Sequence, residues 1–172
     1  MLAKLTERLY SASLALSGAL LVAITVFVLA EILLRALFNV STYVLAEFVG
    51  YALAPMVTFA MASTMQNGQL IRVSLLTPKL PATARRWLEA FCVLLTLAIM
   101  AWFAHLMWQE AALNWRRGAV SDTIARFPLW ITPALSLAGI LVFLMGLIIY
   151  LFRLVKGASP IKDPESADLV AP

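Results

Sequence analysis

Four long runs of the sequence contain no Asp, Glu, Lys or Arg, and they constrain the fold more than any other feature. The runs are residues 9–30, 48–71, 90–109 and 127–152. Each is long enough to cross a hydrocarbon core of about 30 Å as an α-helix, which takes about 20 residues. A segment inside a bilayer must satisfy its own backbone polar groups, and runs of this length do so as helices. The sequence therefore predicts an all-α integral membrane protein with four transmembrane helices.

The composition agrees with this fold class and excludes several others. The chain is 63% hydrophobic and 13% charged, with a mean hydropathy of +0.92, whereas soluble domains are about 45–50% apolar and about 25% charged. This excludes a disordered chain, an ordinary soluble enzyme and a disulfide-stapled domain. The only cysteine, Cys92, cannot form an intrachain disulfide, and the only histidine, His105, cannot build a His-rich metal site. We therefore expect no enzyme activity and no cofactor or metal.

The runs define one domain with two flanking features. We expect a four-helix membrane domain over residues 1–156, with crossings at about 9–30, 46–66, 88–109 and 128–152. The proline-containing, charged segment 157–172 predicts a flexible cytoplasmic tail. Between the second and third crossings, residues 80–91 place Trp87 and other apolar side chains on one helical face and arginines on the other. This pattern predicts a short interfacial amphipathic helix.

The basic residues set the expected orientation. Most of the 13 Lys and Arg residues lie in the amino-terminal tail, the second loop and the carboxyl tail, which share one side of the membrane. The opposite side holds Arg35, Arg116, Arg117 and Arg126. The positive-inside rule therefore predicts that both termini are cytoplasmic. The net charge of +4 follows from this topology, so we expect no nucleic-acid partner.

Three charged residues near the predicted outer ends of the first two helices are candidate contact residues. Glu31 and Arg35 are four apart, with the acid first, which is the favourable order for a helical ion pair. Glu47 opens the second helix, where a negative charge suits the helix amino terminus. Two interpretations are open for these side chains: a solvated ion pair at the membrane rim, which contributes little, or a polar contact with a partner protein.

Small residues recur along the second crossing. The stripe comprises Ala46, Gly50, Ala54, Thr58 and Ala62. Small side chains at this spacing let helix backbones approach closely, which is how membrane helices associate where lipid removes the hydrophobic drive. We expect the stripe to form tight helix contacts, within the domain or with a larger partner.

The order of short motifs resembles one transporter family. The first helix ends in EILLRALFN, and the second begins in YVLAEFVGY. The second loop reads NGQLIRVSLLTPKLPATARR, and the fourth helix lies in ARFPLWITPALSLAGILVFLMGLIIYLFRL. Together, over most of the chain, these segments resemble the small membrane (Q-type) subunit of tripartite ATP-independent periplasmic (TRAP) transporters.

The resemblance implies a function and a set of partners. In such transporters a periplasmic binding protein captures an organic acid, and a large multi-helix membrane subunit moves it inward with a sodium gradient. The small subunit braces the scaffold of the large one in the bacterial inner membrane, in contact with lipids. Glu31, Arg35, Glu47 and Arg72 match the family's recurring polar positions. The chain has Ala46 before Glu47 where the family often has two acids, and Ser74 where the family often has an acid.

Two other functions share the composition. One is a structural or assembly subunit of a different inner-membrane complex. The other is a small stand-alone exporter, which the absence of charged residues from the four runs disfavours. The transported substrate is not encoded in any motif of this chain.

Overall fold

Four α-helices make up nearly all of the described protein. The structure, a computed structural model, describes residues 2–41, 44–66, 82–122 and 126–155. The helices are α1 (Leu2–Phe38), α2 (Leu45–Gln66), α3 (Ala82–Arg117) and α4 (Ile131–Val155). Their candidate membrane spans are Thr6–Phe38, Leu45–Thr64, Trp87–Arg117 and Ile131–Phe152. By length and composition all four are able to cross a membrane, so the prediction of an all-helical chain with four such helices is confirmed.

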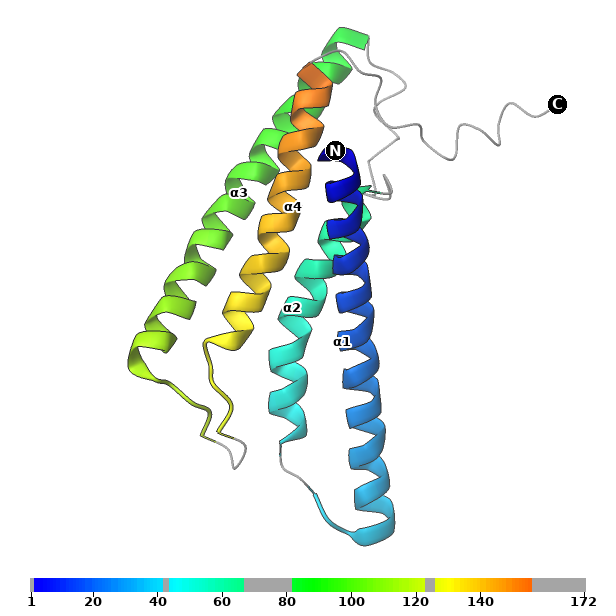
Figure 1. The fold of residues 1–172 in the computed structure, drawn as a ribbon, viewed down its shortest axis with the longest axis vertical. Helices are drawn as coiled ribbons and strands as arrows, with labels where there is room; N and C mark the ends of the chain where they lie inside the picture. Colours follow the sequence, from blue (N-terminus) through cyan, green and yellow to red (C-terminus); the bar gives the residue numbers. More distant parts are fainter. Residues whose placement is uncertain (1, 42–43, 67–81, 123–125, 156–172) are drawn as a thin grey trace, which may run out of the picture.

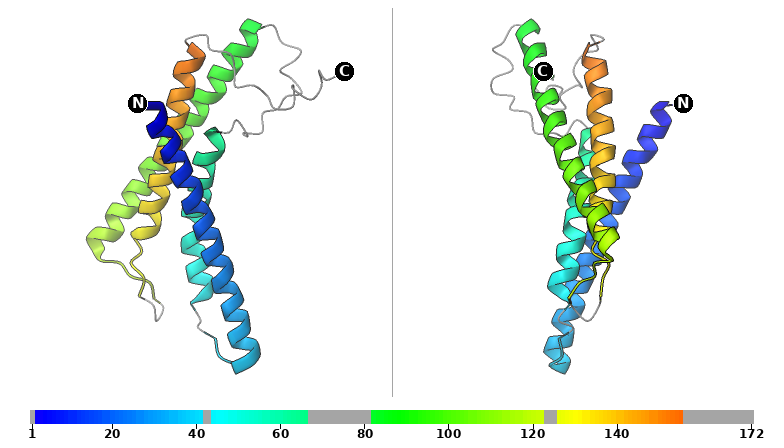
Figure 2. Two further views of the ribbon diagram at one scale, coloured as in Figure 1. Left: turned by 45° about the vertical axis from the view of Figure 1, so that its right-hand side comes forward. Right: turned by 90° about the vertical axis from the view of Figure 1, so that its left-hand side faces the viewer.

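The helices lie side by side in the order α1, α2, α4, α3 (Figure 1). Helix α2 packs against α1 and α4, and α4 packs against α2 and α3, so α2 and α4 form the inner pair. Helices α1 and α3 flank this pair, and they cross at an angle instead of running parallel (Figure 2). The inner helices therefore have neighbours on two sides, whereas the flanking helices leave most of their surface uncovered.

The core lies between α2 and α4. It is formed by Ala62 of α2 and by Phe143, Leu147 and Tyr150 of α4, with partly buried side chains of α3 packed against it. The two helices come closest at Gly139. A Cβ atom at this position would lie 2.6 Å from Oγ1 of Thr58 and 2.9 Å from the backbone nitrogen of Phe59. Only a glycine fits there, because it has no side chain to separate the two backbones.

Residues with positive φ end the two flanking helices. Asn39, with φ of 52°, follows α1, and its amide donates to the carbonyl of Arg35. Gly118, with φ of 59°, follows α3; its amide bonds the carbonyl of Trp115, and the next amide bonds that of Asn114. This pair of bonds is the Schellman arrangement, in which a left-handed residue caps the last helical carbonyls.

The expected interfacial helix is not seen as a separate element, and this prediction was wrong. Residues from Ala82 onward form the first turns of α3, which continues without a break to Arg117. The physical reason is that residues 82–117 contain neither Gly nor Pro, so nothing interrupts the backbone hydrogen bonds between the amphipathic turns and the apolar span. Residues 80–81 and the expected tail 157–172 lie outside the described residues.

Candidate functional site

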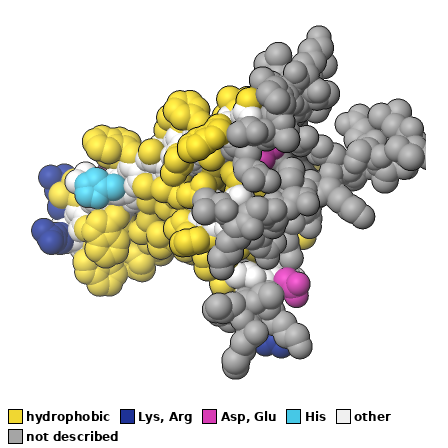
Figure 3. All heavy atoms as spheres, turned by 90° about the horizontal axis from the view of Figure 1, so that it is seen from above, with side chains coloured by type: hydrophobic (Ala, Val, Ile, Leu, Met, Phe, Trp, Pro, Cys, Tyr) yellow, Lys and Arg dark blue, Asp and Glu magenta, His cyan; other side chains and the backbone are white. Residues whose placement is uncertain are grey.

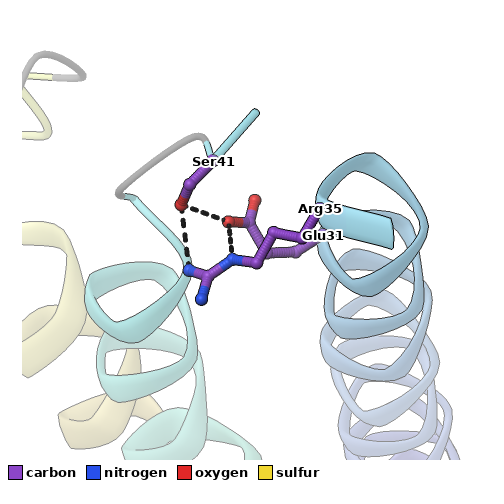
Figure 4. Close-up of polar contacts among 3 residues, drawn as sticks. All are labelled: Glu31, Arg35 and Ser41. Atoms are coloured by element: carbon purple, nitrogen blue, oxygen red, sulfur yellow. Dashed lines mark hydrogen bonds and ion pairs between the residues drawn. The ribbon is translucent and has the colours of Figure 1, made fainter. Parts of the chain in front are cut away.

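Three polar side chains meet where the chain turns from α1 to α2 (Figure 4). Glu31 and Arg35 lie in the last turns of α1, and Ser41 follows the end of that helix. Arg35 Nε donates to Glu31 Oε1 at 2.9 Å, and Ser41 Oγ donates to the same oxygen at 2.7 Å. Arg35 Nη2 in turn donates to Ser41 Oγ at 2.9 Å. These three residues, the Glu31 cluster, form a closed ring of hydrogen bonds.

The carboxylate of the Glu31 cluster is buried, whereas its arginine is exposed. The Glu31 side chain is 2% exposed, whereas the Arg35 side chain is 58% exposed. A buried carboxylate is costly unless charged and hydroxyl donors compensate it. Charge-assisted hydrogen bonds are about twice as strong as neutral ones, and here they join the end of α1 to the segment leading into α2. The cluster thus links the last turns of α1 to the segment that follows the helix.

The structure brings together two of the predicted contact residues and adds one that sequence reasoning missed. The Glu31–Arg35 pair has the helical spacing expected from the sequence. Its acid is buried inside the chain, so it is not a solvated rim residue, and a partner contact by the exposed Arg35 stays a prediction. Ser41 was missed because an isolated serine after a helix has no sequence signal beyond its position near Asn39, where the helix ends.

Glu47 and Arg72 have different surroundings. Glu47 lies in the first turn of α2, and its Oε1 accepts a hydrogen bond of 2.8 Å from the Tyr51 hydroxyl. The Tyr51 ring stacks on Phe127, with 5.4 Å between centroids. Glu47 is therefore linked through Tyr51 to the segment that precedes α4. Arg72 lies outside the described residues, and its role stays a prediction.

The predicted stripe of small residues winds around α2. Ala46, Gly50 and Ala54 are exposed, Thr58 is half-buried against α4, and Ala62 is buried in the core. The reason is geometric: four residues turn an α-helix by about 400°, so each step of four moves about 40° around the axis. The stripe starts on a face that the chain leaves uncovered and ends in the α2–α4 contact.

The uncovered part of the stripe borders a groove between α2, α3 and α4, which we call the α2–α3–α4 groove. Its volume is about 420 Å³. The lining residues are Gly50, Leu53, Ala54, Val57, Thr58, Met61, Met100, Phe103, Met107, Ser136, Ile140 and Phe143. A Cβ atom at Gly50 would have nothing of the described chain within 4 Å. The groove is almost wholly apolar and opens to the outside of the helix row.

The described part of the chain offers no arrangement for catalysis or metal binding. Among these residues, no group of three or more His, Cys, Asp or Glu side chains is placed to hold a metal ion. His105 lies on the exposed surface of α3 and pairs with Gln109, four residues on, at 2.9 Å. The features that stand out are a hydrogen-bonded turn, an apolar groove and broad apolar helix faces, which suit contact with other proteins and lipid.

Comparison with known families identifies the chain. The family model for the DctQ component of tripartite ATP-independent periplasmic transporters matches residues 24–157. No individual curated protein matches the sequence. The family match covers more than half of the chain and extends from α1 to the end of α4. This protein therefore belongs to the DctQ family, the small membrane component of TRAP transporters.

Proposed function

We propose that this chain is the small permease subunit that braces the large membrane subunit during sodium-coupled uptake of an organic acid, which a periplasmic protein delivers. The observation that carries the proposal is the DctQ match over residues 24–157. The family is not catalytic, and a TRAP component implies the other TRAP subunits in general. The bracing role, the sodium ion and the organic acid belong to the proposal.

The charges of the four spans support a bracing role over independent transport. The middle of each candidate span lacks Asp, Glu, Lys and Arg. Transporters that bind substrate or ions at mid-membrane use ionisable side chains or broken helices there. The described helices instead present apolar faces, and apolar side chains cover most of the described surface in the view of Figure 3. Such faces bind lipid or other membrane helices.

Reconstitution tests the proposal directly. Vesicles that contain the large subunit, this chain and an external binding protein should take up the cognate organic acid when a sodium gradient is imposed. We expect uptake to fall at least tenfold when this chain is left out, and to be absent when it is reconstituted without the large subunit. Uptake by this chain alone would make it a transporter in its own right, as the exporter alternative requires. Full uptake by the large subunit in the absence of this chain would contradict the proposed bracing role.

The orientation can be tested on the same chain. We propose that both termini are cytoplasmic, on the basis of the basic residues. In a Cys92→Ser background, Asp122→Cys, between α3 and α4, should react with a membrane-impermeant maleimide added outside spheroplasts. Glu7→Cys, in the first turns of α1, should react only after the membrane is opened. Both native side chains are exposed, and the reverse labelling pattern would place the termini outside.

A further inference from the structure

We propose that the α2–α3–α4 groove receives one transmembrane helix of the large TRAP subunit, and that a polar group on that helix hydrogen-bonds Ser136. This inference rests on the proposed function and names the surface through which it acts. The groove lies on the inner helix pair, where α3 diverges enough from α2 to leave space over α4. Three observations point to a helix as the occupant.

The first observation is an unsatisfied hydroxyl. Ser136 of α4 lines the groove and is 2% exposed. Its Oγ has no hydrogen-bond partner among the described residues. Several other hydroxyls in the described helices bond backbone carbonyls; for example, Ser13 bonds Leu9, and Thr96 bonds Cys92. A buried hydroxyl without a partner costs free energy, and an acyl chain has no group with which to satisfy it.

The second observation is the shape of the groove wall. Gly50 and Ala54 form part of one side, and they leave the α2 backbone open to close approach. This is the surface that membrane helices use for backbone contact, since packing and interhelical hydrogen bonds drive their association in lipid. Lipid tails fill irregular space without any need for such a surface.

The third observation is the adaptability of the lining. Met61, Met100 and Met107 come from α2 and α3 and lie around the groove. The Ser136 hydroxyl is covered in the isolated chain, so a partner reaches it only when lining side chains move. Methionine is unbranched and changes rotamer at little cost, which makes it common at surfaces that must adapt to a partner.

Photocrosslinking from two neighbouring aromatic positions tests the location. Both side chains are exposed, but Phe103 lines the groove and Trp102, the preceding residue on α3, does not. Replacing either with p-benzoylphenylalanine exchanges one aromatic side chain for another at the same depth. In a membrane that also contains the large subunit, we expect a crosslink to that subunit from position 103 and at least tenfold less from position 102.

Every other pattern overturns the groove assignment. Crosslinks of equal yield from both positions, or from 102 alone, would show that the large subunit covers the outer face of α3. A crosslink to a second copy of this chain would make the groove a self-interface. If no crosslink forms while the large subunit still co-purifies with this chain, the groove is occupied by lipid. The groove assignment then fails, and the proposed function stands. If the large subunit does not co-purify with the unmodified chain, the proposed function itself fails.

Removal of the hydroxyl tests the hydrogen bond. Ser136→Ala should weaken the complex with the large subunit roughly threefold, as expected for an average interhelical hydrogen bond, measured as the dissociation constant in detergent. The isolated chain should keep or raise its stability, because the hydroxyl has no partner to lose there. Ser13→Ala is the matched control, since that buried hydroxyl bonds within its own helix. An unchanged dissociation constant for Ser136→Ala would refute the hydrogen bond.

Discussion

The inner helices and the flanking helices differ in how much of their membrane-spanning surface the chain itself covers. In the most apolar stretch of α2 and of α4, 28% and 39% of residues are buried, whereas the corresponding values for α1 and α3 are 6% and 0%. Hydrophobicity does not explain the difference, because the least apolar and the most apolar of the four spans both belong to the inner pair. Their position in the row does, because each inner helix has neighbours on both sides.

This difference separates two uses of an apolar side chain. In water, both kinds of surface would favour burial, but in lipid an exposed leucine has no hydrophobic cost. Buried residues of α2 and α4 then stabilise the chain by close packing alone, and exposed residues of α1 and α3 are available for lipid or another subunit. Identical substitutions in the two regions should therefore have very different effects on the isolated chain.

The largest effect is expected for a leucine-to-alanine change in the core. Leu147 of α4 is buried in the α2–α4 cluster, whereas Leu95 of α3 is half exposed. Leu147→Ala removes packing contacts and leaves a cavity, which we expect to lower the free energy of unfolding by about 2–3 kcal/mol. Leu95→Ala should change it by less than about 0.5 kcal/mol. Unfolding of the purified chain in mixed micelles of increasing SDS content measures both, and equal effects would abolish the distinction between inner and flanking helices.

A second matched pair compares glycines. Gly139 faces Thr58 and Phe59 across the α2–α4 contact, whereas a Cβ atom at Gly18 of α1 would have nothing within 4 Å. Gly139→Ala should force the helices apart and cost about 1–3 kcal/mol. Gly18→Ala should stabilise α1 by about 0.5–1 kcal/mol, because alanine loses less backbone entropy in a helix. The unfolding midpoint in SDS shows whether each variant is stabilised or destabilised. A neutral Gly139→Ala would mean that the close approach of α2 and α4 is not needed for stability.

The same comparison shows what the sequence could predict. The four apolar runs located the four helices that the structure describes, because runs of that length with no charge have one stable structure in a bilayer. They did not give the ends. Helix α1 extends over Leu2–Phe38, well beyond the predicted crossing at 9–30. A run free of charge marks only the part that crosses the membrane. The helix itself continues until a residue such as Asn39 after α1, or Gly118 after α3, turns the chain.

Tertiary contacts account for the residues that were missed. The sequence pattern singled out Gly50, in the stripe of small residues, and gave no signal for Gly139. Of the two, only Gly139 lies against another helix of the described chain. The helical spacing of Glu31 and Arg35 predicted their pairing, whereas the burial of Glu31 and its bond to Ser41 depend on the path of the following turn. Local spacing therefore gave pairs within a helix but not contacts between segments.

The smallest effect is expected at the Glu31 cluster, which connects a flanking helix to an inner one. Glu31→Gln keeps the shape and one acceptor oxygen but weakens the bonds from Arg35 and Ser41. We expect a loss of about 1 kcal/mol, because Arg35 is largely exposed and regains water when its partner is neutral. Glu110→Gln, an exposed acid of α3, is the control and should be neutral. In a double-mutant cycle, Ser41→Ala should cost less in the Glu31→Gln background than in the wild type. Strictly additive effects would show that the turn is held by other contacts, and that the join between α1 and α2 does not depend on the buried carboxylate.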